Sequence, residues 1–231
     1  GEKASSTYDY PSAVPDAPGS LSVNGYTGNS ISLTWTSSID NGDSIDYYHV
    51  YRSTNNIDYS VIDSTSSTGY VDNNGGSGLT EGQTYYYKVS AVNRDGEGLI
   101  TTSVSEFPSA VPESPSSLNL SSYGDEFLSF SWAAPSDHNG DTTTTYHIYR
   151  SENGVDYLEI ATTDFPTVSF TDDDSGFGLV NGKVYYYKIT AENRDGESTF
   201  SKIMSDYSRW TPDAPQDLSR TNQSNSVSIF W

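Results

Sequence analysis

Cysteine is absent from the 231 residues, and basic side chains are scarce, with 11 Lys and Arg against 31 Asp and Glu. The absence of cysteine excludes thiol catalysis, disulfide bonds and cysteine-ligated metal sites, so packing alone must hold the fold together. The net charge of −20 repels phosphate backbones and anionic lipid surfaces, which makes nucleic acid an unsuitable partner. Hydrophobic runs stay below the roughly 18 residues that a membrane helix needs, so we expect no membrane span.

An internal repeat organises the chain. The stretch "YYYKVSAVNRDGEG" from Tyr85 returns as "YYYKITAENRDGES" from Tyr185, and an alternating apolar strand ends at each of Trp35, Trp132 and Trp231. The tryptophans are 97 and 99 residues apart, which is the size of a domain. Solenoid repeats are shorter, at about 20 to 50 residues, so the repeat predicts tandem globular domains.

The repeat predicts two complete domains with a partial domain at each end. Residues 15–111 and 112–211 are the expected complete domains. Residues 1–14 match the last strand and linker of a preceding domain, and residues 212–231 match the first two strands of a following one. We therefore expect a window from a longer array. In the alternative, the partial ends pair between chains by strand donation.

Within each repeat the hydrophobic period is two, and no helical periodicity competes with it. Turn residues separate the alternating runs, which predicts short antiparallel strands. In the first repeat these strands are expected at residues 20–23, 30–36, 47–52, 60–64, 69–72, 84–93 and 99–106. Seven short strands are typical of a two-sheet sandwich. The inward side chains would form the core, in particular Ile31, Leu33, Trp35, Tyr85, Tyr87, Val89 and Ala91.

Four features of the first repeat, taken with their spacing, are typical of one domain family. They are the entry prolines Pro15 and Pro18, the second-strand Trp35, "YYHVYRS" at residues 47–53 and "GLTEGQTYYYKVSAVN" at residues 78–93. Together they resemble the fibronectin type III family over nearly the whole chain. The resemblance implies an all-β fold of tandem seven-stranded immunoglobulin-like (fibronectin type III) β-sandwiches, and an extracellular location, secreted or at a cell surface.

The resemblance also assigns particular roles. Tyr85 and Tyr185 would be corner tyrosines, whose hydroxyls bond to backbone at the entrance of their strand. Glu81 and Asn181 stand where the family usually has proline, a departure that affects only the rigidity of the turn.

No set of catalytic residues can be assembled from the sequence. His49 and His147 occupy equivalent strand positions, and His138 lies in a loop whose counterpart lacks histidine. No nucleophile, base and orienting group fall into a known arrangement, so we predict no enzymatic activity. The Arg-Asp-Gly triplets that begin at Arg94 and Arg194 transpose the Arg-Gly-Asp order of integrin recognition, and they predict a tight turn instead.

Acidic turns raise the question of calcium. Asp172, Asp173 and Asp174 form a run of carboxylates, the ligand type that calcium prefers. The spacing of an EF-hand is missing, and the first repeat has Asn73 and Asn74 in place of the last two. Solvated turns are therefore the default interpretation, with these three aspartates as weak calcium candidates and no other cofactor expected.

The outward face of two neighbouring strands gives the best functional signal. Strand alternation places an aromatic and basic surface there in both repeats, made by Tyr51, Tyr86, His49 and Lys88 and by Tyr149, Tyr186, His147 and Lys188, with Tyr47 and Thr145 beside them. Such a surface would dock an acidic face of a neighbouring domain or stack against sugar rings. Alternatively, cross-strand tyrosine pairs stiffen a sheet that lacks disulfides, each by about 0.2–1 kcal/mol.

Two glycosylation sequons are present, at Asn119 and Asn222, near the first strand of their repeats. Glycans there would cover an exposed sheet edge in a secreted eukaryotic protein. The threonine run 142–145 is a second type of candidate site, for O-linked sugar.

The leading hypothesis is a non-catalytic structural or adhesive fragment of an extracellular array, such as a subunit of a surface filament. Self-association, neighbouring protein domains and glycans are the partners that this hypothesis names. Proline-bearing linkers would limit bending between units. The alternatives are a spacer or carbohydrate-binding accessory module of a larger secreted enzyme, and a receptor ectodomain.

Overall fold

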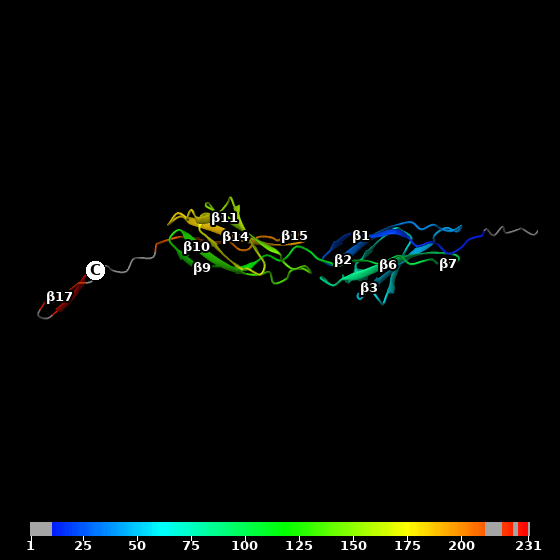
Figure 1. Cartoon of the computed structure of the whole chain (residues 1–231), viewed down its shortest axis with the longest axis horizontal. Helices are drawn as coiled ribbons and strands as arrows, with labels where there is room; N and C mark the ends of the chain where they lie inside the picture. Colours follow the sequence, from blue (N-terminus) through cyan, green and yellow to red (C-terminus); the bar gives the residue numbers. More distant parts are fainter. Residues whose placement is uncertain (1–10, 211–218, 224–225, 231) are drawn as a thin grey trace, which may run out of the picture. The chain divides into compact units, whose positions relative to one another are not determined.

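The chain divides into two compact units, shown in Figure 1 from blue to green and from green to orange. The first contains residues 1–113 with the segments 135–144 and 191–198, and the second contains the remaining residues. The computed structural model describes residues 11–210, 219–223 and 226–230. The expectation for residues 1–14 therefore lies largely outside the described residues. Of residues 212–231, the structure describes an antiparallel pair of strands, β17 (Ser219–Gln223) and β18 (Ser226–Phe230).

Strands β1 to β8 form two facing sheets. One sheet has the order β1-β2-β5 and the other the order β4-β3-β6-β7, with β8 also paired to β6. The strand pairs of both sheets are antiparallel, as the alternating sequence predicts. Their bounds are β1 Gly19–Thr27, β2 Ser30–Thr36, β3 Tyr47–Ser53, β4 Ser60–Thr65, β5 Gly69–Asp72, β6 Tyr85–Asn93, β7 Gly96–Glu97 and β8 Val104–Glu106.

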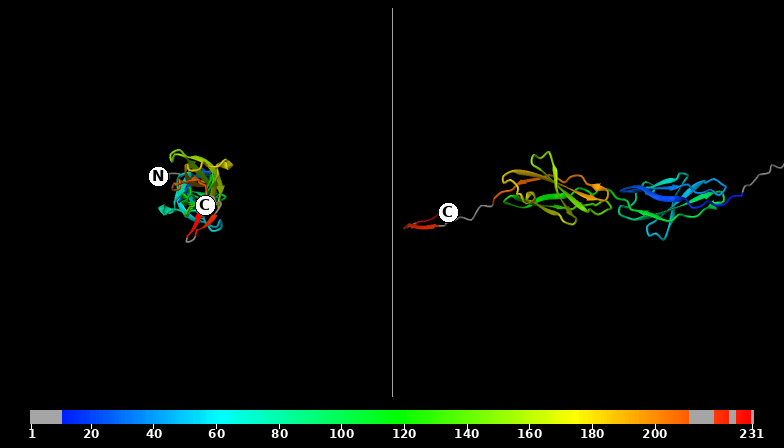
Figure 2. Two further views of the ribbon diagram at one scale, coloured as in Figure 1. Left: turned by 90° about the vertical axis from the view of Figure 1, so that its left-hand side faces the viewer. Right: turned by 45° about the horizontal axis from the view of Figure 1, so that its top comes forward.

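Strands β9 to β16 repeat this architecture, and Figure 2 shows the strands of each unit from two further sides. The sheet orders are β13-β10-β9 and β12-β11-β14-β15, with β16 paired to β14. The bounds are β9 Ser116–Gly124, β10 Phe127–Ala133, β11 Thr145–Ser151, β12 Leu158–Asp164, β13 Ser169–Asp172, β14 Val184–Asn193, β15 Gly196–Glu197 and β16 Met204–Tyr207. One-turn 3-10 helices, η1 (Asn74–Gly76) and η2 (Asp174–Gly176), follow β5 and β13. The predicted pair of sandwiches is confirmed.

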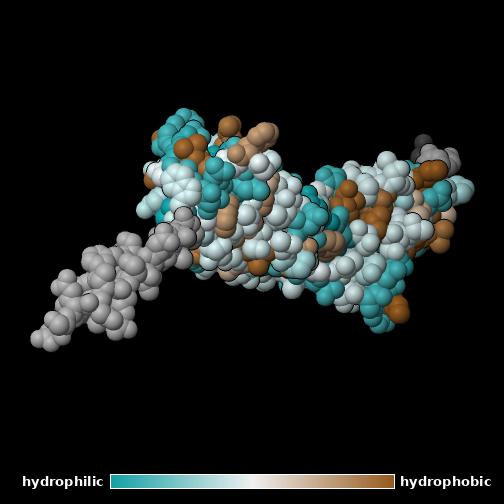
Figure 3. All heavy atoms as spheres, turned by 60° about the vertical axis from the view of Figure 1, so that its left-hand side comes forward, coloured by the Kyte–Doolittle hydropathy of each residue, from teal (hydrophilic) through white to brown (hydrophobic). Residues whose placement is uncertain are grey.

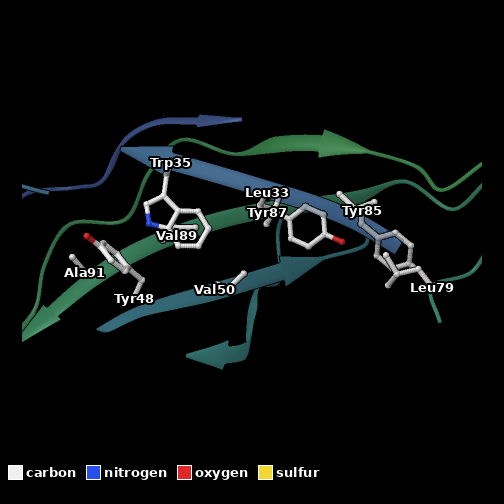
Figure 4. Packing of buried hydrophobic residues seen from close by; sticks show 10 residues of the cluster. Leu33, Trp35, Tyr48, Val50, Leu79, Tyr85, Tyr87, Val89 and Ala91 are labelled. Atoms are coloured by element: carbon white, nitrogen blue, oxygen red, sulfur yellow. The ribbon is translucent and has the colours of Figure 1, made fainter. Parts of the chain in front are cut away.

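The core lies between the two sheets, where Figure 4 shows the inward side chains of the first unit. Trp35 and Trp132 are each only 4% exposed, which confirms that both indoles are interior. In each unit the indole packs edge-on against a buried tyrosine, Tyr48 at 5.5 Å and Tyr146 at 5.3 Å between ring centroids. The predicted core residues of β2 and β6 are all buried. Large aromatic side chains thus fill a core that has no disulfide.

The corner tyrosines are also confirmed. The hydroxyl of Tyr85 accepts a hydrogen bond from the backbone N–H of Thr80 at 3.1 Å, and Tyr185 accepts one from Val180 at 3.2 Å. These bonds fix the loop that leads into β6 and β14. Glu81, at the usual proline position, lies in that loop.

The predicted seventh strand, residues 99–106, is shorter in the structure. Residues 99–103 are not in a strand, and within the predicted range only β8 pairs with β6, while the short β7 pairs with β6 just before that range. At the break, the Oγ1 of Thr101 accepts from the N–H of Val89, and the N–H of Thr101 donates to the carbonyl of Val89. Ser201 and Ile189 make the same exchange in the second unit. A hydroxyl replaces a backbone carbonyl there, so the ladder stays satisfied while the strand changes direction.

Each sandwich encloses a polar network at one end of its core, and the sequence analysis missed it. Asp72, at the end of β5, is 1% exposed and lies between Arg52 and Tyr87. Nη1 of Arg52 is 3.0 Å from both carboxylate oxygens, and the Tyr87 hydroxyl donates to Oδ2 at 2.8 Å. The backbone N–H of Asn74 donates to Oδ1. The acidic group is therefore fully hydrogen-bonded, as a buried charge requires.

The second unit repeats this network with one addition. Asp172 accepts from Arg150 at 3.0 Å and from the Tyr187 hydroxyl at 2.7 Å. Arg150 also binds Asp174, at 2.7 Å, where the first unit has the neutral Asn74. Burial opposes the charge on Arg150, but its hydrogen bonds to Asp174 and Asp172 and their negative charges outweigh that effect and raise its pKa above the ordinary value.

Candidate interaction surface

Strands β3 and β6 build the predicted surface of the first unit. Tyr48 and Val50 of β3 are buried, so their neighbours His49 and Tyr51 point outward. The register places Tyr51 directly opposite Lys88. Tyr86 is opposite Ser53 on the same strand pair. The predicted surface residues therefore share one sheet face, and each is half-buried.

The aromatic side chains of β3 contact one another along the strand. The ring of His49 lies 5.1 Å from that of Tyr47 and 6.2 Å from that of Tyr51, both edge-to-face. The Tyr51 hydroxyl donates to the carboxylate of Glu97 in β7, and burial together with this bond raises the pKa of Tyr51. Burial also raises the pKa of Glu97, but hydrogen bonds from Ser90 and Tyr51 outweigh it, so this pKa is below its ordinary value. These contacts hold the rings in place before any partner binds.

A hollow of about 410 Å³ lies beside Lys88 on this face. The Nζ of Lys88 stands 4.2 Å from the ring centroid of Tyr59. Within residues 11–210 no carboxylate lies within ion-pair distance of Lys88. We call this site the Lys88 hollow, and its lining is Tyr51, Ile57, Tyr59, Lys88, Ile100 and Thr101.

Strand alternation predicted only part of the lining of the Lys88 hollow. Tyr51 and Lys88 line the hollow, whereas His49 and Tyr86 lie on the same sheet face outside it. Ile57 and Tyr59 were missed because they come from an irregular segment, to which strand alternation does not apply. Ile100 was missed because residues 99–103 were expected in a strand, whereas they are irregular in the structure. Ile57 is 79% exposed, and other apolar side chains are exposed on the face shown in Figure 3.

The second unit has an equivalent surface, on which a phenylalanine side chain packs against the lysine. The Nζ of Lys188 lies 4.0 Å from the ring centroid of Tyr157 and 3.4 Å from that of Phe200. Phe200 also meets Tyr149 edge-to-face at 5.1 Å. Phe200 corresponds in sequence to Ile100. A phenyl ring therefore already packs on this lysine in the second unit.

The histidines do not form a site. His147 Nδ1 lies 3.4 Å from a carboxylate oxygen of Glu159, and His49 Nδ1 is 2.9 Å from the hydroxyl of Ser64. His138 Nδ1 is 2.8 Å from the Thr143 hydroxyl in its own loop. Each ring thus makes a local polar contact.

The structure spreads the three calcium candidates over separate partners. Asp172 belongs to the buried network and Asp174 to Arg150, while the Asp173 side chain accepts the N–H of Gly176 at 3.1 Å as the cap of η2. Among the described residues, no group of three or more His, Asp or Glu is placed to hold a metal ion. Calcium binding stays a prediction. Likewise, no helix in the described part of the chain is long and apolar enough to cross a membrane.

The sequon Asn119 is exposed on β9, the outer strand of its sheet. Its side chain donates to the carbonyl of Ser117 at 2.6 Å. Asn222 lies on β17, where side chains are outside the described part of the chain. Glycosylation of both residues stays a prediction.

The Arg-Asp-Gly turn follows a buried asparagine that ties loops together. The Asn93 amide donates to the carbonyls of Ala13, Asp40 and Asp43, at 2.9, 3.2 and 3.4 Å. In the second repeat, Asn193 binds Ala110, His138 and Asp141 in the same manner. The turn is thus structural, and it holds the segment that leads into each repeat.

Replacing Asn93 with alanine should lower the free energy of unfolding by about 1–3 kcal/mol, because three backbone carbonyls lose the buried amide that donates to them. Thermal or urea unfolding of the purified chain measures the change. Asn24 is exposed on β1, and N24A is the matched control, with an expected change within about 0.5 kcal/mol. Equal stability of the two variants would contradict the assigned role.

Comparison with known proteins agrees with this geometry. The fibronectin type III domain profile matches residues 16–107. Residues 16–107 are a fibronectin type III domain. The second unit has the same fold, so the chain contains two such sandwiches in tandem. Domains A168–A170 of titin share the fold, with a TM-score of 0.51 and 18% identity over 85% of this chain and 61% of that structure.

The chain is similar to parts of two proteins with different names. The chain is 27% identical over 191 residues to Chitinase A1 of Niallia circulans, covering 79% of this chain. It is 25% identical over 233 residues to Protein sidekick-1 of Gallus gallus, covering 94% of this chain. The chain spans only 24% and 10% of the lengths of these two proteins.

Proposed function

We propose that the two fibronectin type III domains are non-catalytic adhesive or structural modules of an extracellular protein, and that their tyrosine and lysine surfaces bind partner domains. The supporting observation is the recurrence of this surface. Lys88 and Lys188 lie at equivalent positions on aromatic rings, in a chain whose acidic residues greatly outnumber the basic ones. Rings that already lie beside these lysines lower the ordering cost of binding a partner, which supports a binding role.

A fibre or surface filament is the finer form of this proposal. Tandem domains present the surface more than once, and repeated weak contacts add up to strong attachment. Glycans on the exposed Asn119 would shield the outer strand β9 from uncontrolled sheet pairing.

Replacing Tyr51 and Tyr86 together with serine tests the proposal. Beads coated with the parent chain should cluster, and the double variant should reduce clustering at least about tenfold if these rings contribute hot-spot contacts. The melting temperature should stay nearly unchanged, because both side chains lie outside the core. Unaltered clustering with a lowered melting temperature would show that the tyrosines only stiffen the sheet.

The second candidate is a spacer or carbohydrate-binding module of a secreted enzyme. The similarity to Chitinase A1 over 79% of this chain favours it, and the exposed rings suit stacking on sugars. Retention of the chain on insoluble polysaccharide, lost in the same double variant, would support this candidate instead of protein docking.

A further inference from the structure

The Lys88 hollow lacks the phenyl ring that its counterpart contains. In the second unit, Phe200 packs on Lys188 at 3.4 Å and on Tyr149 at 5.1 Å. In the first unit, Lys88 and Tyr51 occupy the equivalent positions, but the residue beside them is Ile100. The second unit therefore shows which kind of group would suit the Lys88 hollow. It is an aromatic ring held between a lysine and a tyrosine.

The chain itself offers an unburied phenyl ring of this kind. Phe177, directly after η2, is 87% exposed, the highest value among the exposed large hydrophobic residues within residues 11–210. Its counterpart in the first unit is Ser77. Exposed phenylalanine is costly to leave in water, and burying such a side chain in a contact is favourable. This loop thus has an apolar anchor that the other repeat lacks.

A negative charge accompanies this ring. Asp173 precedes Phe177 in the same turn and is exposed, and its side chain is the cap that accepts from Gly176. The first unit has the neutral Asn73 at this position. Of the two equivalent loops, only the one in the second repeat therefore has a phenyl ring and a carboxylate together. Lys88, in turn, has no carboxylate within ion-pair distance in residues 11–210. The Lys88 hollow and the Phe177 loop are therefore complementary: a hollow faces a projecting ring, and a positive charge faces a negative one.

We propose that the Lys88 hollow binds the Phe177 loop of a second copy of this chain, with the Phe177 ring in the hollow and the Asp173 carboxylate beside Lys88. This inference rests on the proposed function and names the partner of the same surface. Since the hollow and the loop are different patches, the contact is heterologous. Each copy keeps one free hollow and one free loop, so the association is open-ended and produces chains of copies.

Replacing Phe177 with serine, the residue of the first repeat, tests the anchor. Sedimentation of the 231-residue chain over a range of concentrations, at about 0.15 M salt, should show masses that rise beyond a dimer. F177S should weaken association at least about tenfold, as expected for a hot-spot residue. The control is I39S, at a residue 66% exposed in another loop, and it should associate like the parent.

A charge exchange tests the pairing. Lys88→Glu should weaken association because two carboxylates then meet, and Asp173→Lys should weaken it because two ammonium groups meet. Mixing the two variants should restore long assemblies, since both unlike pairs are then available. Thermal melting of each variant checks that the fold is intact.

The outcomes separate this inference from the proposed function. A parent chain that stays monomeric at all concentrations, an F177S variant that associates normally, or a failed rescue would overturn the Phe177 contact. If bead clustering is still lost on replacing Tyr51 and Tyr86, the surface binds another partner and the proposed function stands. If clustering also survives that change, both are wrong.

Discussion

Replacing Asp72 with alanine should lower the free energy of unfolding of the first domain by about 3–5 kcal/mol, the usual cost of breaking a buried ion pair. Three donors lose their acceptor at once, namely the Arg52 guanidinium, the Tyr87 hydroxyl and the N–H of Asn74. Calorimetric or urea unfolding of the chain measures the loss. Asp172→Ala should have a similar effect on the second domain, whose network has the same geometry.

Two further variants make this prediction specific. Asp164 is exposed on β12, and D164A should change stability by no more than about 0.5 kcal/mol. Replacing Arg52, Asp72 and Tyr87 together with Met, Leu and Phe should cost less than D72A alone, because the guanidinium and the hydroxyl that D72A leaves without an acceptor are removed as well. A triple variant less stable than D72A would contradict this account of the network.

Both domains should lose stability steeply in alkaline solution. Burial, together with the adjacent Asp72 or Asp172 carboxylate, raises the pKa of Tyr87 and of Tyr187 well above the ordinary 10.0. Burial also raises the pKa of Tyr70 to about 12. Unfolded tyrosines ionise near pH 10, so above that pH the unfolded chain binds fewer protons than the folded one. The free energy of unfolding therefore falls as pH rises, by about 1.4 kcal/mol per pH unit for each such buried tyrosine.

Urea midpoints measured between about pH 9 and about pH 11 check this slope. Stability from these tyrosines is complete below the unfolded pKa and declines as the pH approaches the folded pKa. Y87F should be less stable at neutral pH, by about 1–3 kcal/mol, because Asp72 loses a donor. The same variant should have a shallower alkaline slope. Parallel curves for Y87F and the parent would show that Tyr87 is not the titrating group.

Alternation of apolar residues was enough to predict the sandwiches. Ile31, Leu33 and Trp35 follow the period of two without interruption, and all three are buried. The same rule placed Tyr51 and Lys88 on the outward face, and in the observed register they lie opposite each other. These features depend on regular strands, where neighbouring side chains must point to opposite faces.

The buried network was missed because it contradicts the usual preference of charged residues for the surface. Asp172 was interpreted as a turn residue and a calcium candidate, yet it ends β13 with its carboxylate inward. The signal was available in the repeat, since an arginine, an aspartate and a tyrosine recur at matching positions. The lining from Ile57 and Ile100 had no such signal, because irregular loops follow no period.

The asparagine that ties the entry segment to its domain also affects the response to stretching. Force applied from upstream would reach the bonds that hold residues 12–16 before it reaches the sheets. These are the bonds of Ser12 to Arg94, of residues 13 and 14 to Asn93 and Asn41, and of Asp16 to Ile39. Rupture of those few bonds would release about six residues, or roughly 20 Å of slack at full extension. The segment that enters each domain would thus detach under force and bind again afterwards, while the sandwich stays folded.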